Sequence, residues 1–141
     1  MSRVLLDTNV VSALLAPSGT QATVLLLALT GHVALCVSVA VLAEYDEVMR
    51  RPRLKLDPQK VDAAMAAIRR AARLVAPIKT LTVSPDESDN RFLVCAEAAG
   101  ADWLVTGNIR HFPRSHKGTQ IVTGRQFLDR LAVPGTHASP V

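Results

Sequence analysis

The sequence predicts an α/β fold in which a mostly parallel sheet carries helices on both of its faces. Short apolar runs rich in β-branched residues alternate with longer stretches of helical periodicity, capping residues mark the junctions, and no internal repeat is present. Strands that alternate with helices pair in parallel through right-handed crossovers, because each helix returns the chain to the same end of the sheet.

The N-terminal part predicts one strand and two helices. Arg3–Leu6 is predicted to be a short buried strand, and Asp7–Asn9 directly after it consists of residues that favour a helix start. The turn at residues 16–19 breaks the pattern, and Gln21–Thr30 resumes it as an apolar helix that ends at Gly31.

The next segment predicts a strand, a capped helix and a second amphipathic helix. Val33–Val37 is the strand, and Ser38 can cap the helix that continues through Arg50. Asp57-Pro58 combines an N-cap with proline at the first helical position. The helix that follows carries an apolar stripe at helical spacing, formed by Val61, Met65, Ile68 and Ala72.

Two more strands and one helix are expected in the following segment. Leu81–Val83 predicts a strand, and the acidic segment from residue 86 to residue 89 contains several residues able to cap a helix that ends at Gly100. Trp103–Val105 is the next apolar run and predicts the next strand.

The C-terminal part predicts the last strand, the last helix and the end of the domain. Ile121–Val122 precedes Thr123–Gln126, which fits a capping box and starts a helix to Leu131. We therefore expect a single domain over residues 1–133 and a flexible tail over residues 134–141.

Composition narrows the class of protein. The chain has 141 residues, 49% of them apolar and 20% charged, as is typical of a globular fold. No apolar run reaches the length of a membrane span and no export signal is evident, so we expect a soluble, cytoplasmic protein without a membrane partner. Cys36 and Cys95 lack metal-ligand spacing and are expected to be buried apolar residues.

Acidic or amide side chains stand where predicted strands stop or predicted helices start: Asp7, Glu44, the 86–89 segment and Asn108. In an open α/β sheet, ligands bind outside the carboxyl ends of the strands, so these groups can converge there. Carboxylates that share a cleft repel one another unless a hard cation lies between them. The pattern therefore predicts a divalent-metal site. Glu47 lies one turn beyond Glu44, and either could face the cleft.

Each of these residues also has a purely structural interpretation. A carboxylate after a strand can cap the next helix, glutamate is a good helix former, and an asparagine after Thr106-Gly107 can be a turn residue.

The net charge of +4 favours encounter with polyanions. Arg50, Arg51 and Arg53 could supply phosphate contacts or simply form a solvated face.

Four motifs, taken together, resemble the PIN-domain family. They are Leu5-Leu6-Asp7-Thr8-Asn9-Val10, Ser38 to Val48 around Glu44, Pro85 to Leu93 around Asp89, and Ala98 to Pro113 around Asn108. Within that family the chain resembles the small single-domain proteins described as toxin components of toxin–antitoxin pairs, related to the VapC ribonucleases. The resemblance covers about Val4 to Leu131.

The resemblance implies a three-layer sandwich with a parallel sheet and a Mg²⁺- or Mn²⁺-dependent endoribonuclease that hydrolyses RNA. It also implies a protein antitoxin as partner and a homodimer. Asp7, Glu44 and Asp89 match the family's central carboxylates, which hold the metal and serve catalysis. The positions expected to support them are Asn9, Thr106 and Asp86, and Asn108 lies where many members have a fourth Asp.

Two alternatives stay open at this stage. A PIN-like fold could bind RNA or protein without cutting, and Asn108 in place of an acid keeps this alternative open. A phosphohydrolase that attacks through an aspartate would need a second acid two residues after Asp7, where this chain has Asn9. The four histidines show no zinc-type spacing, although His111 lies near the expected cleft and could contact substrate.

Overall fold

The strands that the structure describes form one sheet. The structure is a computed structural model that describes residues 1–12, 19–77 and 87–132, the side chains of residues 87–89 and 132 excepted. The strands are β1 (Arg3–Leu6), β2 (Ala34–Val37), β3 (Arg73–Leu74), β4 (Trp103–Val105), β5 (Ser115–His116) and β6 (Thr119–Val122). The sheet has six strands in the order β3-β2-β1-β4-β6-β5.

The pairing in this sheet is parallel except at one edge, where β5 runs antiparallel to β6. Val4 of β1 is in register with Leu35 of β2 on one side and Trp103 of β4 on the other. The mostly parallel α/β sheet expected from the sequence is confirmed. Since β1 and β4 are neighbours, the residues that follow them meet at the same edge of the sheet.

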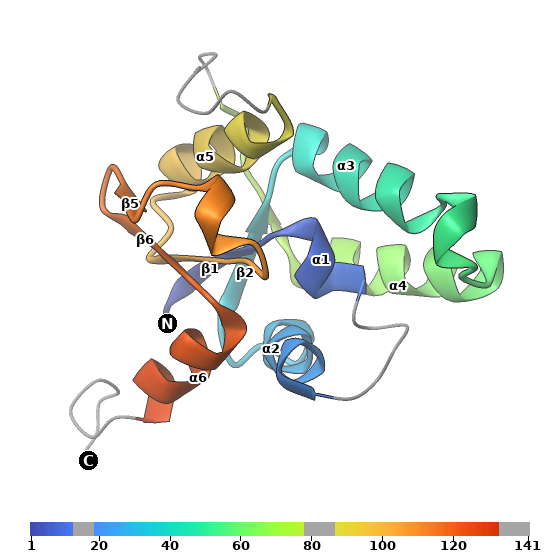
Figure 1. Cartoon of the computed structure of the whole chain (residues 1–141), viewed down its shortest axis with the longest axis horizontal. Coiled ribbons are helices and arrows are strands. Elements are labelled where there is room, and N and C mark those ends of the chain that lie inside the picture. The colour runs from blue at the N-terminus through green and yellow to red at the C-terminus, as the bar shows by residue number, and fades with distance from the viewer. Residues whose placement is uncertain (13–18, 78–86, 133–141) are drawn as a thin grey trace.

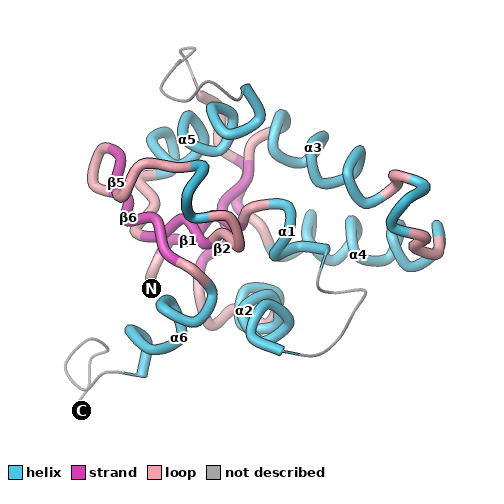
Figure 2. Tube along the Cα trace, in the orientation of Figure 1, coloured by secondary structure: helices cyan, strands magenta, loops and turns pink. Residues whose placement is uncertain are grey.

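Helices cover both faces of the sheet. They are α1 (Thr8–Val11), α2 (Gly19–Leu29), α3 (Val39–Met49), α4 (Pro58–Ala71), α5 (Glu87–Ala99) and α6 (Gly124–Ala132), with short 3-10 turns η2 (Pro52–Leu54) and η3 (Ile109–His111). Figure 1 shows α5 on one side of the strands and α2 and α6 on the other. The strands gather at the centre of the trace in Figure 2, and Val4, Leu5 and Leu6 of β1 are fully buried there.

Local signals fixed most helix starts. Ser38 Oγ accepts a hydrogen bond from the Val41 amide at 3.1 Å, as expected for the cap of α3. Thr123 and Gln126 cap each other's backbone amides at 3.0 and 3.1 Å, which confirms the capping box. Val61, Met65 and Ile68 of α4 are buried as expected, whereas Ala72 lies just past the end of that helix.

Two strands were missed by the sequence pattern, and some predictions lie outside the described residues. Both missed strands, β3 and β5, are two residues long. Three predictions fall outside the described residues: the strand Leu81–Val83, the turn at 16–18 and the tail at 134–141.

The described residues also bear on the expectations drawn from composition. Cys36 and Cys95 are free and buried, as expected. Within the described part of the chain, no helix combines the length and apolar character needed to cross a membrane.

Candidate metal and nucleic-acid site

A cleft of about 460 Å³ opens at the carboxyl ends of β1 and β4. The side chains that line it come from Asp7 directly after β1, from α1 and α3 and the residues that follow them, from η2 and α5, and from the segment after β4. They are Asp7, Thr8, Asn9, Ser12, Glu44, Val48, Arg51, Arg53, Leu54, Phe92, Asn108 and His111. The cleft therefore brings together residues of all four motifs that the sequence singles out, the third of them through Phe92.

Asp7 both caps α1 and reaches the end of β4. Its Oδ1 accepts a hydrogen bond from the Thr8 amide at 2.8 Å, and its backbone amide donates to the Val105 carbonyl at 2.8 Å. Its Oδ2 accepts a hydrogen bond from the Thr106 hydroxyl at 2.6 Å. The capping interpretation of Asp7 is correct, and it coexists with a place in the cleft.

The loop after β4 is held by one hydrogen bond within the loop and one to α1. The Thr106 hydroxyl accepts a hydrogen bond from the Asn108 amide at 2.9 Å, and Asn9 Oδ1 accepts one from the Gly107 amide at 3.1 Å. A Cβ at Gly107 would lie 2.9 Å from Asn9 Nδ2 and 3.0 Å from Gln21 Nε2, so only glycine fits without displacement. Asn9 and Thr106 thus hold the loop that presents Asn108.

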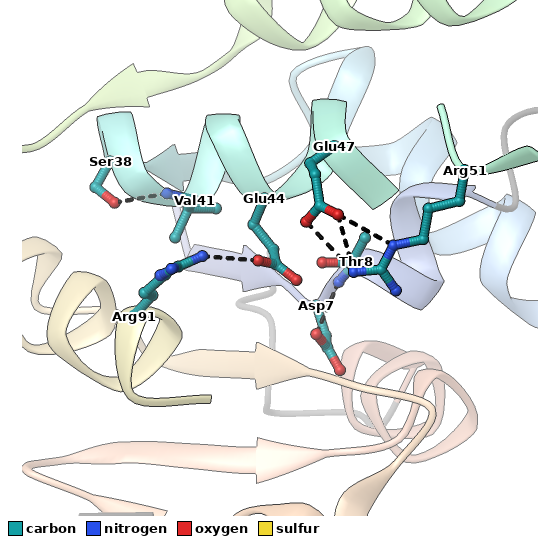
Figure 3. A network of polar contacts seen from close by, with 8 residues as sticks. All are labelled: Asp7, Thr8, Ser38, Val41, Glu44, Glu47, Arg51 and Arg91. Atoms are coloured by element: carbon teal, nitrogen blue, oxygen red, sulfur yellow. Dashed lines mark hydrogen bonds and ion pairs between the residues drawn. The ribbon is translucent and has the colours of Figure 1, made fainter. Parts of the chain in front are cut away.

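Glu44 enters the cleft from α3 with its side chain almost entirely buried. Arg91 of α5 donates a hydrogen bond from Nη1 to Glu44 Oε1 at 2.9 Å. Figure 3 shows the Glu44 carboxylate between Arg91 on one side and Asp7 on the other. The neighbouring Tyr45 donates its phenolic hydrogen to the Leu6 carbonyl, which fixes α3 against the end of β1.

The choice between Glu44 and Glu47 is decided by the lining of the cleft. Glu44 lines it, whereas Glu47 is not among the lining residues and instead binds the Arg51 guanidinium, with Nη2 to Oε2 at 3.1 Å. The Glu47–Arg51 pair is visible beside Thr8 in Figure 3. Glu47 therefore orients a cleft arginine rather than adding a carboxylate to the lining.

The predicted basic contacts divide into two groups. Arg51 and Arg53 line the cleft and are called its basic rim below. Asp7 and Glu44, which line the same cleft, are called its acidic floor. Arg50 is not among the lining residues and pairs with Asp46 at 3.0 Å and Asp62 at 2.6 Å. His111 lines the cleft on the side of the β4 loop, where the sequence allowed a substrate contact.

Two predicted acids cannot be placed. The backbone of Asp89 belongs to α5, but its side chain lies outside the description, and Asp86 lies wholly outside it. Among the side chains that the structure does describe, no three His, Cys, Asp or Glu residues form a group able to hold a metal ion. The convergence of Asp89 with Asp7 and Glu44 stays a prediction.

The donor set of the cleft fits a hard divalent cation. Asp7 and Glu44 offer carboxylate oxygens, and Asn108 offers an amide oxygen. Thr8 Oγ1 is buried and finds no hydrogen-bond partner among the described residues, although Thr8 lines the cleft. Oxygen ligands of this kind suit Mg²⁺ and Mn²⁺, whereas the described lining residues include no cysteine, whose thiolate would favour a softer metal.

Sequence reasoning missed Arg91 and Thr8 in the site. Thr8 lies inside the quoted Asp7-Thr8-Asn9 motif, so its position in the motif was the available signal. Arg91 follows the acidic 86–89 segment by two residues, but its contact with Glu44 depends on how α5 packs beside α3.

Comparisons with known proteins identify the family and the fold of the chain. A model of the PIN domain family matches residues 3–110, a span that includes Asp7, Glu44, Asp89 and Asn108. One chain of the crystal structure of VapBC2 from Rickettsia felis, bound to a DNA fragment from their promoter, is similar in fold with a TM-score of 0.56. That match has 16% sequence identity and covers 84% of this chain and 98% of the other.

No curated protein sequence matches the chain. At 16% identity the likeness to the VapBC2 chain shows the fold alone, whereas the family model covers well over half of the sequence. The resemblance seen in the sequence motifs is confirmed: this chain belongs to the PIN domain family.

Proposed function

We propose that this protein is a Mg²⁺- or Mn²⁺-dependent endoribonuclease. PIN-domain proteins are typically nucleases and generally depend on a metal. The observation that carries the proposal is that Asp7 and Glu44, from distant segments, line one cleft together with Arg51 and Arg53. An acidic floor beside a basic rim suits a cation and the phosphates of a nucleic acid.

The residues of the cleft would divide the work as follows. Asp7 and Glu44, with Asp89 as the expected third carboxylate, would hold the cation. When bound, the cation supplies a counter-charge to the scissile phosphate and acidifies water for the attack. Thr106 holds the Asp7 carboxylate in place through its 2.6 Å hydrogen bond, so Asp7 needs little reorganisation. Arg51 and Arg53 would bind the phosphates that flank the reacting one.

The biological setting is proposed on the resemblance to toxin components. The chain would act in the cytoplasm as a homodimer, as the toxin of a toxin–antitoxin pair, with a protein antitoxin covering the cleft. The similar fold of a VapBC2 chain from Rickettsia felis supports this setting. Co-expression with the protein encoded beside it, followed by size-exclusion chromatography, would test both the partner and the dimer.

A non-catalytic RNA-binding module is the second candidate, and one observation favours it. Asn108 lines the cleft where many family members have an acid, so the anionic charge of the floor is reduced. The phosphohydrolase alternative loses support, because the Asn9 amide at the required acid position binds the Gly107 backbone instead.

The decisive experiment incubates the purified full chain with a labelled RNA pool and Mn²⁺. Asp7→Asn and Asp89→Asn keep side-chain size while removing a ligand charge, and each is expected to lower the cleavage rate roughly a hundredfold or more. Asp46→Asn is the matched control, because Asp46 is an acid on α3 that does not line the cleft. Wild-type protein that binds RNA but never cuts it would support the binding module, and cleavage that survives in both cleft variants would refute the site.

A further inference from the structure

The Arg91–Glu44 ion pair differs from the other arginine pairs near the cleft. The Glu44 side chain is 9% exposed, and Arg91 Nη1 lies 2.9 Å from its Oε1. In the pairs of Arg50 and Arg51, by contrast, the carboxylates of Asp62 and Glu47 are 67% and 61% exposed. Arg91 therefore neutralises a carboxylate that water reaches poorly.

A carboxylate buried to this degree needs a compensating charge. Taking an ionised carboxylate out of water costs free energy unless a partner donates a hydrogen bond to it. A buried carboxylate without such a partner destabilises the fold. Without a divalent cation, the guanidinium of Arg91 provides that compensation at Glu44. A metal ion in the cleft would bind this same carboxylate.

We propose that Arg91 is a positioning residue that acts through Glu44, as an internal counter-cation that competes with the divalent ion for this carboxylate. The inference rests on the proposed function, because it takes Glu44 as a metal ligand. Arg91 is 42% exposed, so its guanidinium can withdraw toward solvent when a metal binds. The pair thus stabilises the metal-free cleft and weakens metal binding.

The direction of the effect separates this role from a merely structural one. If Arg91 only held Glu44 in place, its loss would weaken both folding and metal binding. As a competing cation, its loss lowers the stability of the metal-free protein but raises its affinity for the metal. Repulsion between a guanidinium and a divalent ion a few ångströms away, in a partly hydrated site, corresponds to about tenfold in affinity.

The test measures Mn²⁺ affinity by isothermal titration calorimetry and melting temperature in EDTA on the full chain. Arg91→Met removes the charge and keeps the aliphatic stem, and Arg91→Gln is a second neutral variant in case the first folds poorly. Arg91→Lys keeps the charge. Arg50→Met is the matched control, because it removes the same charge from a residue that pairs with Asp46 and Asp62, neither of which lines the cleft.

We expect both neutral variants to bind Mn²⁺ about tenfold more tightly than wild type and to melt at a lower temperature in EDTA. Arg91→Lys and Arg50→Met should stay within about threefold of the wild-type affinity. Neutral variants that bind Mn²⁺ equally or more weakly would overturn the inference while leaving the proposed metal site intact. An equal gain in Arg50→Met would also overturn it, because net charge would then be the cause. Absence of Mn²⁺ binding in wild type and variants alike would overturn the proposed metal site and the inference with it.

Discussion

Thr106 is the residue on which the acidic floor of the cleft depends most directly. Its side chain is fully buried, its hydroxyl donates to Asp7 Oδ2 at 2.6 Å, and the same oxygen accepts from the Asn108 amide at 2.9 Å. One hydroxyl thus links Asp7, the residue directly after β1, to the loop after β4. A change here should affect both the fold and the cleft.

Thr106→Val is expected to destabilise the protein by about 1–3 kcal/mol and to weaken Mn²⁺ binding, because a buried acceptor and donor lose their partner. Urea denaturation and calorimetry measure the two effects. Thr119→Val is the matched control: Thr119 is also buried, but its hydroxyl donates to the Ala101 carbonyl at 2.7 Å and not to a residue that lines the cleft. Equal loss of Mn²⁺ affinity in both variants would contradict the assigned role of Thr106.

At the scale of single residues, the sequence could predict the groups that sit at strand and helix ends. Asp7 and Asn108 line the cleft because β1 and β4 are parallel neighbours, and that follows from the fold class. Arg91 could not be predicted, since its contact depends on the packing of α5 against α3. That the Asp89 side chain joins Asp7 and Glu44 remains a prediction, because this side chain lies outside the described residues.

At the scale of elements, one tyrosine sets the position of α3 against β1. Tyr45 is fully buried and donates its hydroxyl hydrogen to the Leu6 carbonyl. Burial raises the pKa of Tyr45 well above its ordinary value of 10.0, so the phenol stays protonated and keeps donating. Because Glu44 precedes Tyr45 and Asp7 follows Leu6, this hydrogen bond holds both cleft acids in register.

The raised pKa of Tyr45 gives a pH dependence with a definite sign. Because the pKa of Tyr45 is higher in the folded than in the unfolded state, the protonated phenol contributes fully to the free energy of unfolding below pH 10. This contribution is lost as pH rises above 10, at up to about 1.4 kcal/mol per pH unit. We expect Tyr45→Phe to cost about 1–2 kcal/mol at pH 8 and to lose less stability than wild type between pH 10 and pH 11.

Urea denaturation at several pH values measures this difference. The buried thiol of Cys95, whose pKa burial raises to about 12, contributes to alkaline destabilisation in wild type and variant alike. Parallel pH profiles for Tyr45→Phe and wild type above pH 10 would contradict the assignment to Tyr45.

The helices were predictable because their signals are local, and the short strands were not. The mutual caps of Thr123 and Gln126 depend on residues three apart, whereas β3 exists only through its pairing with β2. The turn before β6 places Lys117 and Gly118 at φ values of 51° and 87°. Two-residue hairpin turns require such angles, but lysine rarely adopts them, so the usual sequence signal of a hairpin is absent at Lys117-Gly118.

At the scale of the whole molecule, a net charge of +4 combines with a basic rim on the proposed RNA site. Phosphate contacts release counterions, so RNA binding should weaken with salt by a logarithmic slope of about 0.7 per contact on a single strand. Measurement of this slope on Asp7→Asn, which separates binding from cleavage, tests the rim.

Arg51→Met and Arg53→Met, each added to Asp7→Asn, are expected to reduce that slope by about 0.7, because each removes one phosphate contact. Arg130→Met is the control: this arginine lies 5.4 Å from the centre of the Trp103 ring and does not line the cleft. Fluorescence anisotropy with a labelled oligonucleotide at several salt concentrations gives the slopes. If Arg130→Met changes the slope as much as the cleft variants do, RNA does not follow the proposed rim.

The two edge strands of the described sheet, β3 and β5, are each only two residues long. An edge strand this short exposes few unpaired backbone amides and carbonyls. An incoming chain needs such groups in order to add to the sheet and grow into a fibril. The native protein should consequently resist self-assembly through its sheet even at high concentration, and a seeded thioflavin assay on folded material should stay flat.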